Sequence, residues 1–543
     1  MVFARRSTTL LAAIIASCAM VLSLTACTSD NKTVVDGQTT VTSNSAGGVA
    51  VFTPSDGITL NQQTPLNKWA KLVPDLAKAL ADAGFKKGDI NHTTSDSLAK
   101  QSRAIQDFVV DHLSNNTTDD SGIAIAPDNM TLLVAPVVEA DASTRQYGDY
   151  ISQNLSTNDA TDGEATSDGE SSEDDSSKDD SSNTESDSTA SDEQAQAVDR
   201  LVSSLKLAKE SGMHVVLLGN SIEGYKPDAF VKFSDAQTIG KLQAEKMVSK
   251  LKLDKASKDN PKYIEVLLPY TAVDEKGNAN DSTFAQEAFR GIWQVLGSYY
   301  QKGAVESPSG TLDGKSTEND WQAVAYDAAK EGSTAKVLDK RLAKTDGQST
   351  LTRIDGIITM NDYIASEVVK ELDDLGYTGS AADINPQITI SGIVGNITGK
   401  KDLSRDAVPD PIKSPENDNA NDSSSSDDDA DEDTSASDKD RDSQWPLVTG
   451  YGAYVSNIPS IVNGKQWMTG MEDRQTIATD IAQACAKLNK DEALNSMPSI
   501  RNSEVGGVKK IPTISEPLLA VSASNLKSAL IDPGYISLAD AGL

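Results

Sequence analysis

The chain has 543 residues, in which 49 Lys and Arg stand against 81 Asp and Glu, so its formal net charge is −32. This charge excludes a general nucleic-acid binder, which needs a basic surface. The length allows two or more domains of ordinary size, and 38% hydrophobic residues suffice for buried cores.

The N-terminal residues have the pattern of a bacterial export signal. Arg5 and Arg6 precede an apolar run over residues 10–24, which Leu24-Thr25-Ala26-Cys27 follows. That last stretch resembles the lipobox of bacterial lipoproteins, which implies that residues 1–26 are removed and that Cys27 is lipidated. The chain would then be lipid-anchored on the extracytoplasmic face of the cell membrane; the alternative is a plain signal peptide with an incidental cysteine. We expect a flexible tether over residues 27–46, which are mostly polar.

From Gly47 onward, short runs rich in Val, Ile and Leu alternate with helical patterns. In residues 69–84, apolar Leu72, Leu76 and Leu80 recur at intervals of four. The first set of predicted elements is strand 48–52, helix 69–84, helix 97–113, strand 131–138, helix 195–211 and strand 214–218. The second set is helix 237–251, strand 263–268, helix 282–300, helix 321–343, strand 356–360, helix 362–376 and strand 387–393. Each set reads as repeated β-α-β, which predicts an α/β fold with two parallel sheets.

Two acidic tracts interrupt this alternation. Residues 159–193 hold 14 acidic residues and one basic residue, and residues 413–442 hold 12 acidic and three basic residues. Because they contain almost no aliphatic side chains, we expect two disordered inserts, over about 146–195 and 412–444. The first follows the carboxyl end of strand 131–138, the edge at which open α/β sheets bind ligands.

Catalytic and metal-binding patterns are missing from the sequence. The histidines are His92, His112 and His214, and none lies in a pattern that suggests a Ser-His-Asp triad or a metal site. Cys485 sits in the apolar run 481–488, so we expect it to be buried rather than reactive. We therefore expect no enzymatic activity, no cofactor and no metal.

Several segments resemble type I periplasmic sugar-binding proteins, most closely the xylose and multiple-sugar branch. Residues 201–222 resemble the helix and strand that lead into the cleft of that family, and residues 446–469 resemble its strand, small-residue turn, helix and return strand. Residues 507–512 and 518–522 resemble its C-terminal extension. The resemblance implies the type I periplasmic-binding-protein fold, in which two Rossmann-like lobes are joined by three crossovers.

The resemblance also gives domain boundaries. The crossovers are expected near 234–235, near 450–452 and between about 502 and 510. Lobe I would comprise 47–234 and 452–505, and lobe II would comprise 235–451 and a C-terminal segment, 506–543.

The function that the resemblance implies is that of a solute-binding lipoprotein of an ABC importer. It would capture a small-molecule ligand, a sugar or sugar-like carbohydrate, between the lobes and deliver it to the permease. We expect a monomer with no nucleic-acid partner. The alternative is a sensory or interaction lipoprotein that keeps the two-lobe fold without transport.

The same resemblance selects candidate ligand-binding residues. Trp69 matches the first-lobe aromatic residue of the family, and Lys68 stands where the family often has Arg. Asn361 and Asp362 follow a second-lobe strand at positions used for hydroxyl contacts, although Asp362 could instead be a helix N-cap.

Three further candidates stand where this sequence departs from the family. Asn220 follows Gly219 in place of an Asp-Arg pair, Tyr451 lies between two glycines in place of Gly-Gln-Asp, and Asp235 replaces a crossover Asn. Two strong hydroxyl acceptors are thereby lost, so the expected ligand is a neutral glycoside or short oligosaccharide rather than a free pentose.

Overall fold

The computed structural model describes residues 33–35, 38–40, 46–55, 65–115, 125–138, 144–156, 185–273, 280–343, 351–382 and 445–543. The predicted signal, Cys27 and strand 387–393 lie outside these residues, as do residues 157–184 and 383–444, which include most of the first predicted insert and all of the second. No helix among the described residues is long and apolar enough to cross a membrane.

The chain divides into two units, residues 1–45 and 46–543. In the first, β1 (Thr33–Val35) pairs antiparallel with β2 (Gln38–Thr40). The flexible tether over 27–46 stays a prediction.

Lobe I is built on a seven-stranded sheet with the order β17-β18-β9-β7-β5-β3-β4. Its strands are β3 (Gly48–Pro54), β4 (Ile90–Ser95), β5 (Met130–Val134), β7 (His214–Leu218), β9 (Ala229–Val231), β17 (Ile500–Val505) and β18 (Val508–Ile514). All neighbours are parallel except β17 and β18. Central β5 is buried along its whole length, as expected for a parallel strand covered on both faces.

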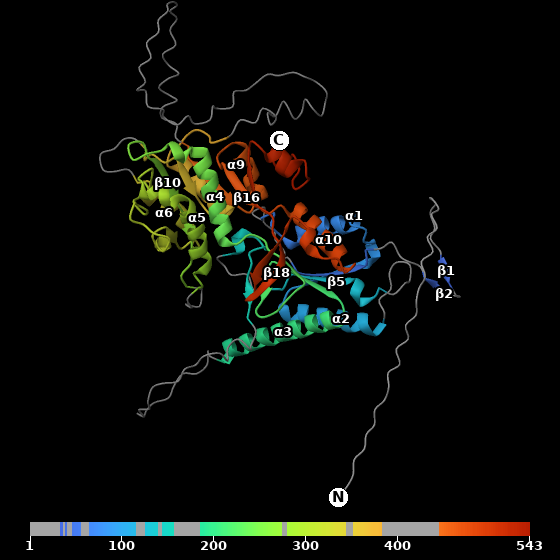
Figure 1. Ribbon diagram of the computed structural model, residues 1–543. Helices are drawn as coiled ribbons and strands as arrows, with labels where there is room; N and C mark the ends of the chain where they lie inside the picture. The colour runs from blue at the N-terminus through green and yellow to red at the C-terminus, as the bar shows by residue number, and fades with distance from the viewer. Residues whose placement is uncertain are drawn as a thin grey trace, which may run out of the picture. The chain divides into compact units, whose positions relative to one another are not determined.

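Two pairs of helices cover the lobe I sheet (Figure 1). Helix α1 (Trp69–Asp82) packs with α10 (Arg474–Leu488) against one face, and α2 (Leu98–Asn115) packs with α3 (Glu185–Glu210) against the other. Alternate side chains of the strands enter the two resulting cores: Leu133 and Val216 face α1 and α10, whereas Leu132 and Val215 face α2 and α3.

Lobe II is built on a six-stranded sheet with the order β12-β10-β14-β15-β16-β19, parallel except for edge strand β19. Its strands are β10 (Lys262–Val266), β12 (Val305–Glu306), β14 (Gly356–Ile358), β15 (Leu447–Tyr451), β16 (Met468–Met471) and β19 (Leu519–Ser522). Its helices are α4 (Ala236–Leu251), α5 (Thr283–Gln301), α6 (Ser333–Arg341), α7 (Asp362–Asp374) and α9 (Ile458–Val462). Helices α4 and α5 can pack closely because Gly291 has no side chain. A Cβ at this position would lie only 2.0 Å from the carbonyl oxygen of Gln237.

This topology confirms the predicted fold class of two doubly wound α/β lobes joined by three crossovers. The first crossover lies between β9, which ends at Val231, and α4, which begins at Ala236. The second was predicted near 450–452, which is wrong because β15 and β16 are neighbours in one sheet; the chain crosses at Glu472-Asp473 instead.

The third crossover also differs from its prediction. Residues 502–510 belong to the hairpin of β17 and β18, which turns at Gly506 and Gly507 with φ of 55° and 76°. The chain therefore crosses between Ile514 and Leu519. Lobe I includes residues 474–514, and only 519–543 return to lobe II.

Two further element predictions are wrong. Residues 321–343 do not form one helix: a 3-10 turn (Asp320–Ala323) and β13 (Ala325–Tyr326) come first, and α6 begins only at Ser333, after Gly332 adopts a left-handed φ of 70°. The bounds predicted for the first insert, 146–195, are too wide, because both ends of this range form regular structure. A 3-10 turn (Arg145–Tyr147) and β6 (Asn154–Leu155) lie near its start, and α3 begins at Glu185.

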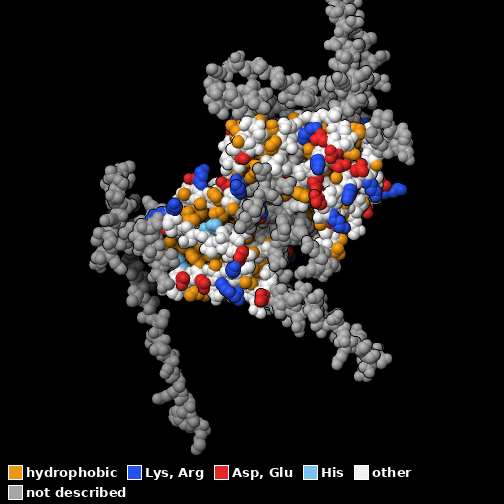
Figure 2. Space-filling view, turned by 180° about the vertical axis from the view of Figure 1, so that it is seen from behind, with side chains coloured by type: hydrophobic (Ala, Val, Ile, Leu, Met, Phe, Trp, Pro, Cys, Tyr) orange, Lys and Arg blue, Asp and Glu red, His pale blue; other side chains and the backbone are white. Residues whose placement is uncertain are grey.

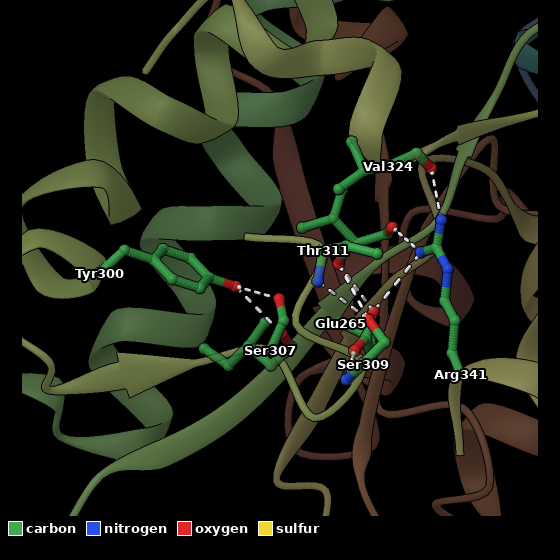
Figure 3. A network of polar contacts seen from close by, with 9 residues as sticks. Glu265, Tyr300, Ser307, Ser309, Thr311, Val324 and Arg341 are labelled. Carbon is green, nitrogen blue, oxygen red and sulfur yellow. Dashed lines mark hydrogen bonds and ion pairs between the residues drawn. The ribbon is translucent and has the colours of Figure 1, made fainter. Parts of the chain in front are cut away.

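A buried charged pair fixes the loops of lobe II (Figure 3). The carboxylate of Glu265 on β10 accepts the backbone N–H of Ser309 at 2.9 Å. The guanidinium of Arg341 lies 3.5 Å from Glu265 and donates to the carbonyl groups of Val266 and Val324 at 2.5 and 2.9 Å. Burial raises the pKa of Glu265, while the Ser309 hydrogen bonds and the charge of Arg341 oppose that shift. The pair thus ties α6 to β10 and to the chain before β13.

Candidate ligand-binding cleft

Most of the predicted ligand-binding residues lie just after, or at the end of, parallel strands. Asn220 follows β7 in lobe I, Asn361 follows β14 in lobe II, and Tyr451 ends β15. Lys68 and Trp69 lie at the start of α1, the helix that follows β3. This is the edge at which open α/β sheets bind ligands.

A segment of the chain itself lies among these residues. Residues 144–156, here called the cleft segment, follow β5 and include β6, which pairs with β8 (Ser221–Ile222) of lobe I. Asp149 of the cleft segment forms an ion pair of 2.6 Å with Lys68 and accepts the backbone N–H of Trp69 at 3.1 Å. The predicted cationic contact is therefore already paired within the chain.

The indole ring of Trp69 is enclosed. Only 3% of the residue is exposed, and its ring centroid lies 5.1 Å from that of Tyr150 and 5.6 Å from that of Phe233. Tyr150 stacks on Phe233 at 4.6 Å and donates its hydroxyl to the carbonyl of Lys68 at 2.6 Å. Trp69 is therefore buried among aromatic side chains of the chain itself, and a ligand contact at Trp69 stays a prediction.

Asn220 is also engaged by neighbouring chain. Its side-chain oxygen accepts the backbone N–H of Gln153 from the cleft segment at 2.9 Å. Its side-chain nitrogen donates to the carbonyl of Pro136 at 2.9 Å. The oxygen and the nitrogen of the Asn220 side chain thus both bind backbone groups of residues that follow β5.

On the lobe II side, the cleft segment meets Asn361 and Tyr451. The side-chain nitrogen of Asn361 donates to Gln146 Oε1 at 3.2 Å, and the hydroxyl of Tyr454 donates to the Gln146 carbonyl at 2.6 Å. The ring of Tyr147, only 1% exposed, lies 4.6 Å from Phe284 and 6.2 Å from Tyr451. The cleft segment therefore bridges the two lobes.

Asp362 serves the fold of lobe II. Asn361, rather than Asp362, is the N-cap of α7, because its side-chain oxygen accepts the backbone N–H of Ile364 at 2.9 Å. The carboxylate of Asp362 accepts from the Tyr454 N–H at 2.9 Å, the Thr469 hydroxyl at 2.8 Å and the Gln466 amide at 2.7 Å. Burial raises its pKa to about 6 against the effect of these hydrogen bonds. Asp362 thus anchors the turn after β15.

Asp235 caps a helix at the first crossover. Its carboxylate accepts the backbone N–H of Thr238 at 2.8 Å and pairs with Lys232 at 2.9 Å. These contacts lie within α4 and the residues that lead into it, and a ligand contact at Asp235 stays a prediction.

The sequence did not reveal a buried cluster at two of the crossovers. Glu472 accepts the backbone N–H of Ser234 at 2.7 Å and also its hydroxyl, and the Ser234 hydroxyl lies 2.7 Å from that of Tyr451. Burial raises the pKa of Glu472 to about 6. The cluster thus connects the first crossover, which follows β9, with the second crossover, which begins at Glu472.

The cleft segment was missed as well, because residues from 146 onward were assigned to the acidic insert. The acidic residues become dense only after residue 158, whereas Tyr147, Tyr150 and Ile151 are apolar or aromatic. That local enrichment was the available signal for an ordered segment.

The chemistry of the site is that of binding. Its polar groups are amides, phenols and paired charges, and no group of three or more His, Cys, Asp or Glu that could hold a metal is found among the described residues. Cys485 is fully buried, as predicted, and burial raises the pKa of its thiol. On the side drawn in Figure 2, Lys and Arg are interspersed with Asp and Glu rather than gathered into one basic patch.

The chain is similar to solved structures of other proteins, but only in fold. No protein-family model and no curated protein matches the chain. An ABC transporter solute-binding protein from Clostridium phytofermentans with bound β-D-glucose is 17% identical, over 91% of this chain and 99% of that one, with a TM-score of 0.44. A carbohydrate transporter solute-binding protein from Chloroflexus aurantiacus with D-glucose is 19% identical, over 92% and 98%, with a TM-score of 0.42.

A periplasmic ribose ABC transporter from Conexibacter woesei is 13% identical, over 90% of this chain and 96% of that one, with a TM-score of 0.41. At such identities and scores, the likeness does not establish a shared activity.

Proposed function

We propose that this chain is an extracytoplasmic solute-binding lipoprotein that captures a neutral, hydroxyl-rich ligand, such as a sugar, between its lobes. One observation carries the proposal: candidate residues from both lobes, at the ends of parallel strands or at the start of α1, each contact the same cleft segment. These residues are Lys68, Trp69, Asn220, Asn361 and Tyr451.

The side chains at this place suit a sugar or glycoside. Amides such as Asn220 and Asn361 both donate and accept hydrogen bonds, as hydroxyl groups require. The rings of Trp69 and Tyr451 supply apolar faces of the kind that pack against a sugar ring. The one cation, Lys68, is paired with Asp149, so a neutral ligand fits better than an anion.

Delivery to the permease of an ABC importer is the second part of the proposal. It is supported by the sequence Leu24-Thr25-Ala26-Cys27, which resembles a lipobox. A lipid-anchored carrier stays close to its membrane partner, which raises its effective concentration there. The three crossovers provide a hinge about which the lobes could open and close.

Calorimetric titration and thermal shift test the proposed ligand class. The panel contains D-glucose, D-allose, L-arabinose, myo-inositol, simple glycosides and short oligosaccharides. We expect saturable binding to at least one of them, weakened at least tenfold by Asn361→Asp. This variant keeps an acceptor for the helix cap but removes the amide donor. If no panel member binds saturably, the proposed function is wrong.

A sensory lipoprotein is the second candidate, and the occupied cleft favours it. A chain that fills its own cleft could present a fixed surface to a membrane receptor without carrying solute. Neighbouring genes discriminate between the two: a permease and an ATPase indicate import, whereas a histidine kinase indicates sensing.

A further inference from the structure

The chain already fills the place where the proposed ligand would lie. Toward lobe II, the cleft segment places the Tyr147 ring beside Phe284 and Tyr451, and it offers Gln146 Oε1 to Asn361 and the Gln146 carbonyl to Tyr454. An apolar face together with two hydrogen-bond acceptors is also what a glycoside would offer to the same side chains, through the C–H face of its ring and its hydroxyl oxygens.

Toward lobe I, the segment makes contacts of a different kind. The carboxylate of Asp149 pairs with Lys68, the ring of Tyr150 covers Trp69, and the backbone of Gln153 donates to Asn220. A single short segment thus occupies recognition groups on both sides of the cleft at once.

The segment is held by side chains, by one tight turn and by three backbone hydrogen bonds to lobe I. The N–H of Asp149 donates to the carbonyl of Asn67 at 2.8 Å, and the carbonyl groups of Gln153 and Leu155 accept from the chain of β8 and the residue after it at 2.9 and 2.8 Å. Its strand pairing among the described residues is limited to β6 with β8, over two residues. Gly148 separates the two halves with φ of 98°, and a Cβ there would lie 2.5 Å from the carbonyl oxygen of Asn67. A segment fixed in this way can be displaced without breaking either central sheet.

We propose that residues 144–156 are an internal occupant of the cleft, so that ligand binds only when this segment is displaced. The inference rests on the proposed function, because it assumes that the cleft takes a ligand. The apparent dissociation constant is then larger than the intrinsic one, by the inverse of the fraction of molecules whose segment is displaced. The segment also sets a selectivity threshold, because a ligand must replace both its aromatic contact and its hydrogen bonds.

Two variants that loosen the segment test this inference. Tyr147→Ala removes the ring on the lobe II side, and Gly148→Ala introduces the clash with Asn67 without changing any recognition group. Gly224→Ala is the matched control, because Gly224 has φ of 69° but no atom lies within 4 Å of the added Cβ. We expect Tyr147→Ala and Gly148→Ala to bind the best sugar of the panel at least tenfold more tightly than wild type, and Gly224→Ala to bind like wild type.

Hydrogen exchange in the wild-type chain gives a readout that needs no variant. The amides of Asp149 and Gln153 are protected by hydrogen bonds to Asn67 and Asn220. A saturating sugar should accelerate their exchange at least tenfold while the amides of β7 remain protected. Slower exchange on sugar binding would overturn the inference, because the segment would then close over the ligand.

The binding outcomes separate the two proposals. If wild type and both variants bind a sugar equally, the inference is wrong and the proposed function stands. If Tyr147→Ala binds more weakly, Tyr147 is a ligand contact, and the inference is again wrong. If neither wild type nor any variant binds a panel member, the proposed function itself fails.

Discussion

Trp69 is a core residue of lobe I that would also join the proposed binding site. Its ring packs against Phe233 of lobe I on one side and against Tyr150 of the cleft segment on another. Displacing the segment would remove Tyr150 and expose part of the indole. The ring therefore contributes to stability in the filled cleft and becomes available to a ligand only after the segment moves.

Trp69→Ala is expected to lower the free energy of unfolding by about 3 to 5 kcal/mol, the usual cost of removing a large buried aromatic side chain. Urea denaturation measures this loss, and Trp69→Phe, which keeps a ring, should lose less than half as much. If Trp69→Ala instead leaves stability unchanged and only weakens sugar binding, the indole lies at an open cleft surface.

Glu472 should make stability depend on pH. Burial raises its pKa in the folded chain from the ordinary 4.5 to about 6, so the folded state binds the proton more tightly than the unfolded state does. The corresponding stability is fully present below pH 4.5 and is lost as the pH rises through about 6. The loss amounts to about 2 kcal/mol.

Glu472→Gln should remove that part of the pH dependence, since the amide oxygen can still accept from Ser234. Melting curves between pH 4 and 8 on both proteins give the difference. Asp362, whose pKa is also about 6, contributes equally to both and cancels. Parallel curves for the two proteins would show that Glu472 is not protonated in this range.

The network around Glu265 acts at the scale of whole elements, because it links β10, α6 and the chain before β13. Arg341→Met removes the donors to Val266 and Val324 and leaves Glu265 buried without its counter-charge. We expect a loss of about 3 to 5 kcal/mol of stability.

A double-mutant cycle checks the coupling. Arg341→Met combined with Glu265→Met should cost less than the sum of the single variants, because the buried charge is then gone. Additive losses would mean that Arg341 acts through its carbonyl contacts alone.

Elements were predictable where a continuous apolar pattern marked them. Strand β5 and helix α1 follow from their sequences because both bury most of their apolar side chains. The exposed edge strand β4, Ile90-Asn-His-Thr-Thr-Ser95, was missed because its polar residues carry no such pattern. Residues 321–343 were predicted as one helix, but buried Trp321 and Tyr326 belong to a 3-10 turn and to β13. Their spacing of five residues does not place them on one face of a helix.

The candidate site was predictable only in part, for a related reason. The predicted strands placed Asn220 and Asn361 at the carboxyl edges of their sheets, and both residues lie there in the structure. What surrounds them depends on contacts between distant parts of the chain. Asn361 meets Gln146, 215 positions away, and Ser234 meets Glu472, 238 positions away. No local pattern encodes such pairs.

At the scale of the whole molecule, Cys27→Ala should release the chain from the membrane without changing its sugar affinity. The reason is that a single lipidated cysteine would be the only anchor that the sequence predicts. Fractionation of cells that express the variant measures release, with calorimetry as the control for folding. Tight membrane association of Cys27→Ala would show that the signal is retained or that a protein surface binds the bilayer.

The crossovers have a further consequence for how the chain folds. Strand β18 of lobe I and strand β19 of lobe II both come from residues 508–522, and the side chain of Asn489 donates to the carbonyl groups of Ala46 and Gly48 beside the first strand. Neither lobe can therefore be completed until nearly the whole chain is available to fold. Such high contact order slows folding. With the export proposed above, slow folding would keep the polypeptide unfolded while it crosses the membrane.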